Sequence, residues 1–148
     1  MVDVVPGITA AQGAAAKLGL PLTDRKQARR LQYVTGHAKD GDLPGDLDWR
    51  SLADPTTTSA IYMPVKTLAA LVARATAEGL DPRTPALAIS RATRPDQAVV
   101  SSPIGELPKR LAKAALPGPV LVMLGQVLVQ QASEQVVTSA SSSAKAAQ

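Results

Sequence analysis

Apolar residues recur along this chain with two different periods, which predict helices and strands in alternation. Thr9 is a suitable N-cap, and the alanines and Leu18 that follow it recur at helical spacing as far as Gly19. Further helices are predicted over residues 49–53 after Asp48, 66–78 before Gly79, and 105–115. Strands are predicted over residues 1–5, 31–35, 57–63, 86–89, 97–101 and 120–124.

The order of these elements indicates an α/β fold. Only residues 90–96 separate the strands at 86–89 and 97–101, which favours an antiparallel hairpin, and the strand at 120–124 is apolar throughout, as in a strand buried on both faces. We therefore expect a mixed β-sheet flanked by helices, in a domain over residues 1–129. The composition then turns to Ser, Ala and Gln, so residues 130–148 are expected to be a disordered tail.

Composition removes several classes of chemistry. The 148 residues include no cysteine and one histidine, which excludes disulfide scaffolds, thiol nucleophiles and Cys/His zinc sites. His37 follows a predicted strand, where it is either a general acid–base residue or a hydrogen-bonded loop residue. Four aspartates in residues 40–48 invite a calcium site, but Pro44 stands at the fifth loop position and Ser51 replaces the bidentate glutamate of an EF-hand. No metal site is expected.

Charge and hydropathy narrow the range of partners. The 16 Lys and Arg residues against 12 Asp and Glu give a net charge of +4, and Trp49, Tyr33 and Tyr62 are the only aromatic residues, so no nucleic-acid partner is expected. No apolar run approaches the length of a membrane span, and the N-terminus lacks a basic region followed by an apolar one. We expect a soluble, cytoplasmic protein without a membrane partner.

Two groups of basic side chains leave the nature of the ligand open. Residues 25–30 carry four of them, and Arg91 and Arg94 lie in the predicted hairpin turn. Such groups form either a solvated surface or a docking site for a carboxylate-rich ligand, because arginine binds carboxylates in a bidentate manner. No phosphate loop, GxGxxG or GxSxG motif occurs in the sequence, so these general patterns do not identify a ligand.

Six strings in a fixed order carry a family resemblance. They are VPGITA at 5–10, GLPLTDR at 19–25, YVTGHAKDG at 33–41, IYM at 61–63, TRPDQ at 93–97 followed by VV at 99–100, and GPVLVMLGQV at 118–127. In this order and spacing, over about residues 4–129, they resemble the C-terminal half of the uroporphyrinogen-III C-methyltransferases of the tetrapyrrole methylase family.

The resemblance implies a cofactor, a substrate and partners. It implies methyl transfer from S-adenosylmethionine, which becomes S-adenosylhomocysteine, to C2 and C7 of uroporphyrinogen III, with precorrin-2 as the product for sirohaem and cobalamin synthesis. It also implies a homodimer of two-domain subunits, with the cofactor in the cleft between the domains. This chain would begin at the inter-domain junction and lack the N-terminal domain. Because that domain holds the family's catalytic residues, none is expected here and the isolated chain is expected to be inactive.

The resemblance also implies five cofactor-binding residues. Thr9 and Ala10 match a Thr-Ala pair that contacts the cofactor largely through backbone groups. Met63 matches the methionine of a Tyr-Met-Gly string that lines the adenosine site. Ala92 and Thr93 match the Gly-Thr of a turn near the adenine.

The chain departs from the family pattern at two of these positions. Pro64 follows Met63 in place of glycine, which removes one N–H donor, and Ala92 replaces a glycine that tolerates a positive φ. The candidates for substrate carboxylates are four arginines, Arg29, Arg30, Arg91 and Arg94.

Two alternative functions stay open from the sequence. One is a non-catalytic binding or dimerisation module that keeps the methylase fold. The other is another corrin-pathway methylase, which ranks last because the strings at 33–37 and 93–97 look closer to the uroporphyrinogen enzymes.

Overall fold

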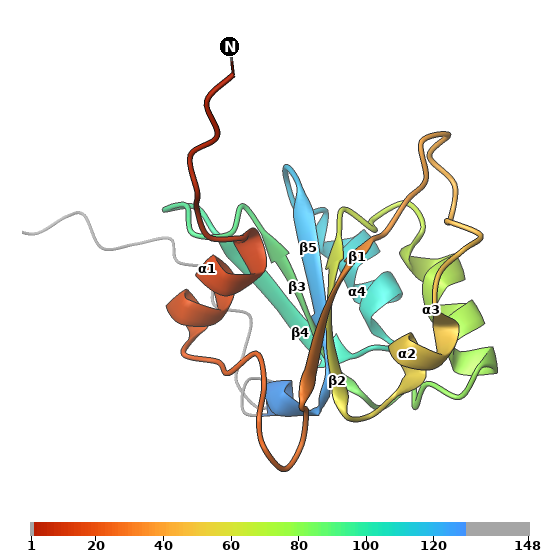
Figure 1. The fold of residues 1–148 in the computed structure, drawn as a ribbon. Coiled ribbons are helices and arrows are strands. Elements are labelled where there is room, and N and C mark those ends of the chain that lie inside the picture. The colour runs from red at the N-terminus through yellow and green to blue at the C-terminus, as the bar shows by residue number, and fades with distance from the viewer. Residues whose placement is uncertain (1, 130–148) are drawn as a thin grey trace, which may run out of the picture.

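A mixed five-stranded sheet with helices on both faces forms the centre of the molecule (Figure 1). The computed structural model describes residues 2–129. The strands are β1 (Arg30–Thr35), β2 (Thr57–Tyr62), β3 (Pro85–Ser90), β4 (Ala98–Pro103) and β5 (Val120–Leu124). The helices are α1 (Ala10–Leu18), α2 (Trp49–Ala53), α3 (Leu68–Ala77), α4 (Leu107–Ala114) and the 3₁₀ helix η1 (Gln126–Leu128). The predicted α/β class and mixed sheet are confirmed.

The strand order is β1-β2-β5-β3-β4, with the last strand in sequence at the centre. β1 and β2 are parallel, whereas β5 runs antiparallel to both β2 and β3, and β3 and β4 form the predicted antiparallel hairpin. Every residue of β5 is buried, in agreement with its unbroken apolar sequence.

Two apolar clusters lie on opposite faces of the sheet. Residues of α2, α3 and α4 pack on one face around Ile61 and Val122, and the alanines of α1 pack with η1 on the other face around Leu121 and Met123. Because α1 contributes small side chains, it packs close to the strands. Figure 1 shows α1 alone on its side of the sheet and the other three α-helices together on the far side.

Local sequence signals explain where the helices begin and end. Thr9 forms a capping box with Gln12, and Gly19 ends α1 with a φ of 66°. Asp48 caps α2 by accepting a hydrogen bond from the Ser51 N–H at 3.0 Å. The helices α3 and α4 are shorter than predicted by a few residues, because residues 64–67 and 103–106 form turns before each of them.

The predicted strand over residues 1–5 is wrong for the part that the structure describes. Residues 2–5 form no strand, and Val2 and Val4 are both 89% exposed. This segment leads away from the sheet (Figure 1), so its β-branched residues have no neighbouring strand to pair with. The predicted tail, residues 130–148, lies outside the described residues. Within residues 2–129, no helix combines the length and the apolar character needed to cross a membrane.

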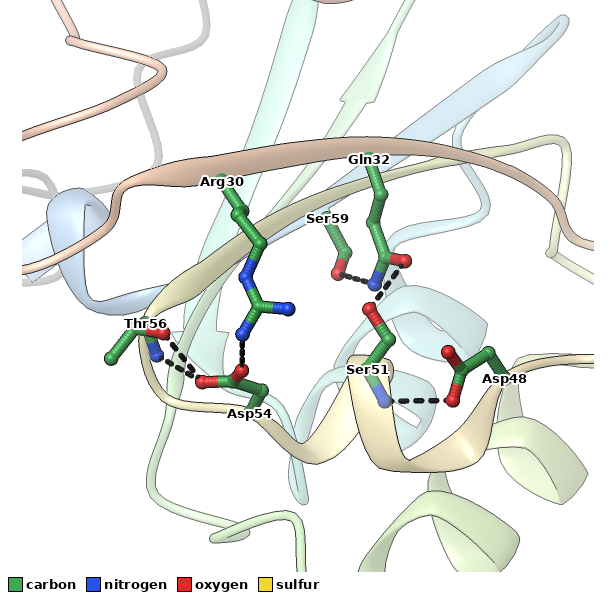
Figure 2. A network of polar contacts seen from close by, with 7 residues as sticks. All are labelled: Arg30, Gln32, Asp48, Ser51, Asp54, Thr56 and Ser59. Atoms are coloured by element: carbon green, nitrogen blue, oxygen red, sulfur yellow. Dashed lines mark hydrogen bonds and ion pairs between the residues drawn. The ribbon is translucent and has the colours of Figure 1, made fainter.

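A polar network attaches the edge strand β1 to α2 and β2 (Figure 2). The Gln32 amide donates to the Ser59 hydroxyl at 2.7 Å and accepts from the Ser51 hydroxyl at 3.0 Å. Beside it, Arg30 forms an ion pair with Asp54. These contacts hold the edge strand from the α2 side of the sheet, opposite α1.

Candidate functional site

A hollow of about 190 Å³ lies at the end of the sheet where β2 and β3 finish and β5 begins. It is lined by Ala10 of α1, by Tyr62 and Met63 at the end of β2, by Ile89, Arg91, Ala92 and Arg94 at the end of β3 and in the turn after it, and by residues 119–121. Four segments that are distant in sequence therefore meet at one place.

The first turn of α1 offers backbone donors to this hollow. The Thr9 hydroxyl accepts from the Gln12 N–H at 3.2 Å, and the Ala11 N–H donates to the Tyr62 hydroxyl at 3.4 Å. The Ala10 N–H makes no hydrogen bond within residues 2–129. A helix N-terminus carries partial positive charge, and the small Ala10 side chain leaves its backbone approachable. This corner of the hollow suits a polar acceptor on a ligand.

Met63 forms the second wall in an unusual backbone conformation. Its φ is 51°, its N–H donates to the Val120 carbonyl at 3.0 Å, and 51% of the residue is exposed. The following Pro64 is buried against Gly36, where an added Cβ would lie 2.6 Å from the Pro64 Cβ. Pro64 therefore packs against the loop after β1, and the half-exposed Met63 lies at the edge of the hollow.

The turn after β3 forms the third wall. Arg91 and Thr93 have φ values of 50° and 70°, whereas Ala92 between them has no positive φ. The positive φ therefore falls on both neighbours of Ala92, the residue that the resemblance matches to a glycine. A β-branched residue with such a φ is a genuine outlier, and outliers of this kind cluster at functional sites.

Electrostatic contacts tighten the same turn. Arg91 forms an ion pair with Asp96, and the Arg91 hydrogen bond is the main reason that the pKa of Asp96 lies below its usual value. Arg94 is also close to Asp96, with Nε and Oδ1 3.8 Å apart, and its side chain is 71% exposed. Both arginines carry charge at the rim of a largely apolar hollow, which suits a ligand with an apolar ring and a carboxylate.

Helix α1 contacts this turn directly. A Cβ added to Gly13 would lie 2.4 Å from the Thr93 Cγ2, so only glycine allows the two segments to come this close. Near the end of α1, the Lys17 ammonium group donates to the Arg94 carbonyl at 2.9 Å. The turn and the helix thus form one continuous wall.

The structure brings together some of the sequence candidates and separates others. Ala10, Met63 and Ala92 line the hollow together, and so do the substrate candidates Arg91 and Arg94. Thr9 and Thr93 adjoin lining residues without lining the hollow themselves.

The other two candidates, Arg29 and Arg30, lie at the opposite end of the sheet. Arg30 pairs with Thr57 at the start of β2, about 20 Å along the strands from Met63. It also forms the ion pair with Asp54 (Figure 2).

Sequence reasoning missed several residues of the hollow. Tyr62 and residues 119–121 line it, but their apolar pattern indicated only strand structure. His37 has a buried Nδ1 with no hydrogen-bond partner among the described residues and does not line the hollow. Within residues 2–129 no group of three His, Cys, Asp or Glu side chains gathers as a metal site.

Comparison with known proteins decides the family. The family model described as Tetrapyrrole (Corrin/Porphyrin) Methylases matches residues 1–108 of this chain. The chain belongs to this family. As a tetrapyrrole methylase it is 48% identical over 127 residues to the sirohaem synthase of Gluconacetobacter diazotrophicus, with 85% of this chain and 27% of the relative covered. It is 45% identical over 126 residues to the uroporphyrinogen-III C-methyltransferase of Paracoccus denitrificans, with 84% and 43% covered.

Solved methylase structures agree with the fold. The uroporphyrin-III C-methyltransferase of Thermus thermophilus, complexed with S-adenyl homocysteine, matches with a TM-score of 0.69 and 31% identity, over 86% of this chain and 54% of that one. A cobalt precorrin-4 methyltransferase matches with a TM-score of 0.74 at 20% identity, over 85% and 52%, and at that identity shows the fold alone. The chain thus spans about half, or less, of the length of each of these four proteins.

Proposed function

We propose that residues 1–129 act as the C-terminal half of an S-adenosylmethionine-dependent uroporphyrinogen-III C-methyltransferase, with the hollow as one wall of its cofactor site. The observation that carries the proposal is the meeting of Ala10, Met63 and Ala92, from three separate segments, in one hollow. Further support comes from the 45% identity to the Paracoccus enzyme and from the Thermus relative that was solved with S-adenyl homocysteine.

The residues of the hollow fit the proposed cofactor in three respects. The apolar lining and the half-exposed Met63 suit an adenine ring, the open Ala10 N–H suits a polar acceptor, and Arg91 suits a carboxylate. Bound S-adenosylmethionine supplies a methyl group activated by a sulfonium. The work of the protein is then to hold that group in line with the acceptor carbon and to exclude water.

Arg91 and Arg94 are the stronger of the proposed contacts to substrate carboxylates. Both lie on the rim of the hollow, whereas Arg30 is the first residue of β1, at the opposite end of the sheet, and Arg29 directly precedes it. A substrate whose reacting carbon approaches the hollow would therefore meet the Arg91 and Arg94 side chains first. The proposed product is precorrin-2, formed by methylation at C2 and C7.

Methyl transfer by this chain alone is not expected. The lining residues include no carboxylate and no histidine, the side chains that most often act as general bases. A volume of about 190 Å³ is also below the few hundred Å³ of most small-molecule sites, as suits one wall of a larger site.

Calorimetry with S-adenosylhomocysteine tests the proposal. The 148-residue chain is titrated alone and together with the half of a uroporphyrinogen-III C-methyltransferase that it does not match, and precorrin-2 formation is assayed in the same samples. We expect tighter binding and measurable product only in the mixture. Met63→Ala should weaken that binding, whereas Val129→Ala, at a similarly exposed position outside the lining, should not. Product formation by the chain alone, or no binding in either sample, would contradict the proposal.

A further inference from the structure

The turn between β3 and β4 holds an energetically costly conformation, and one buried side chain supports it. Thr93 has a φ of 70°, which is unfavourable for a β-branched residue. The Gln97 side-chain carbonyl accepts a hydrogen bond from the Thr93 N–H at 2.7 Å. Only 9% of Gln97 is exposed, so this acceptor is largely shielded from water, which makes its loss harder to replace by solvent.

The conformation of this turn determines the shape of the hollow. Ala92 lines the hollow and is bonded directly to Thr93. The Thr93 methyl group contacts α1 at Gly13, and the Arg94 carbonyl accepts from Lys17 of the same helix. A shift of Thr93 therefore changes the separation between the turn and α1, whose first residue, Ala10, also lines the hollow.

We propose that Gln97 is a positioning residue for the cofactor site: by holding the Thr93 N–H, it keeps Ala92 in place against the first turn of α1. This inference rests on the proposed function, because it assigns Gln97 a part in binding the same cofactor. Gln97 does not line the hollow and acts only through the turn.

Three variants separate a positioning role from a general loss of stability. Gln97→Met keeps the side-chain length and removes the acceptor, whereas Gln97→Glu keeps an oxygen acceptor for the Thr93 N–H. Gln32→Met is the matched control, because the Gln32 side chain also accepts a hydrogen bond in the fold, but on the α2 side of the sheet and away from the hollow (Figure 2).

The experiment measures S-adenosylhomocysteine affinity and melting temperature in the same mixture of chain and complementary half for all four proteins. Q97M should weaken binding about fivefold, the factor that corresponds to one ordinary hydrogen bond of about 1 kcal/mol. Q97E should stay within about twofold of the wild type. Q97M and Q32M should lower the melting temperature by similar amounts, because each loses side-chain hydrogen bonds. Q32M should leave the affinity unchanged.

Hydrogen exchange gives a second readout, and its measurement on the wild-type chain does not depend on any variant folding. The Thr93 amide of the wild-type chain should be protected from exchange, although Thr93 is exposed, and the protection should be lost in Q97M. An unprotected Thr93 amide, wild-type affinity in Q97M, or an equal affinity loss in Q32M would overturn the inference. A wild-type mixture that binds no S-adenosylhomocysteine would instead overturn the proposed function itself.

Discussion

At the scale of single residues, backbone strain marks the hollow. Four non-glycine residues within residues 2–129 have a positive φ, and Met63, Arg91 and Thr93 are three of them. Two of these line the hollow, and the third adjoins it. The fourth, Ala115, ends α4 elsewhere in the fold. A conformation that costs energy is retained where something else requires it, and we interpret the shape of the proposed site as that requirement.

Replacing the strained threonine tests this interpretation. Thr93→Gly relieves a left-handed conformation at the cost of extra chain entropy, so the free energy of unfolding should rise by about 0.5 kcal/mol. S-adenosylhomocysteine affinity should fall, because the turn loses its contact with α1. Ala115→Gly is the control, since Ala115 has a φ of 46° outside the hollow, and it should gain similar stability without changing affinity. Urea unfolding and calorimetry measure the two quantities, and a Thr93→Gly variant with undiminished affinity would refute the interpretation.

At the scale of elements, α1 packs against the sheet and the turn after β3 through small residues, which bring the backbones close together. Its buried face consists of Ala11, Gly13, Ala14 and Ala15, which allow the helix to lie against the sheet and the turn. Helical periodicity predicted this helix correctly, including its cap and its end. The sequence alone could not show that Gly13 meets Thr93, because that contact joins residues 80 positions apart and depends on tertiary packing.

Gly13→Ala tests the contact between α1 and the turn. Alanine favours the helix by about 1 kcal/mol, but its Cβ displaces the Thr93 side chain, so the free energy of unfolding should change little. S-adenosylhomocysteine binding should weaken, because Ala92 moves with Thr93. Gly45→Ala serves as a control, since nothing lies within 4 Å of a Cβ added there. Equal affinities for both variants in calorimetry would show that the contact is not needed for binding.

Turns of the fold share an electrostatic feature that predicts the pH dependence of stability. Hydrogen bonds to carboxylates lower the pKa of four aspartates in or beside turns: Asp24, Asp54, Asp81 and Asp96. Their stabilisation is present above the ordinary pKa of 3.8 and is lost as the pH falls through the lowered values of the folded state. The free energy of unfolding should therefore fall below about pH 4, and Asp54→Asn should reduce that fall. Urea unfolding from about pH 2.5 to 7 measures it, and stability that rises on acidification below about pH 4 would contradict the account.

At the scale of the whole molecule, the two ends of the sheet differ. Strand and helix positions could be predicted from periodicity, apart from residues 2–5, where β-branched residues lack a partner strand. The family strings pointed to Ala10, Met63 and Ala92, which the fold brings together. The sequence could not show that Arg91 and Arg94 lie at the hollow whereas Arg30 lies at the far end of the sheet. The position of each arginine depends on the direction and register of the strands.

The central claim is that the hollow binds the methyl-donor cofactor, and amide chemical shifts test it most directly. The isotope-labelled chain, mixed with an unlabelled complementary half, is titrated with S-adenosylhomocysteine. The account predicts that the largest shift changes fall on Ala10, Met63 and Ala92, with little change at Arg29 and Arg30. Shift changes concentrated at the Arg30 end of the sheet, or absent from the three lining residues, would contradict it.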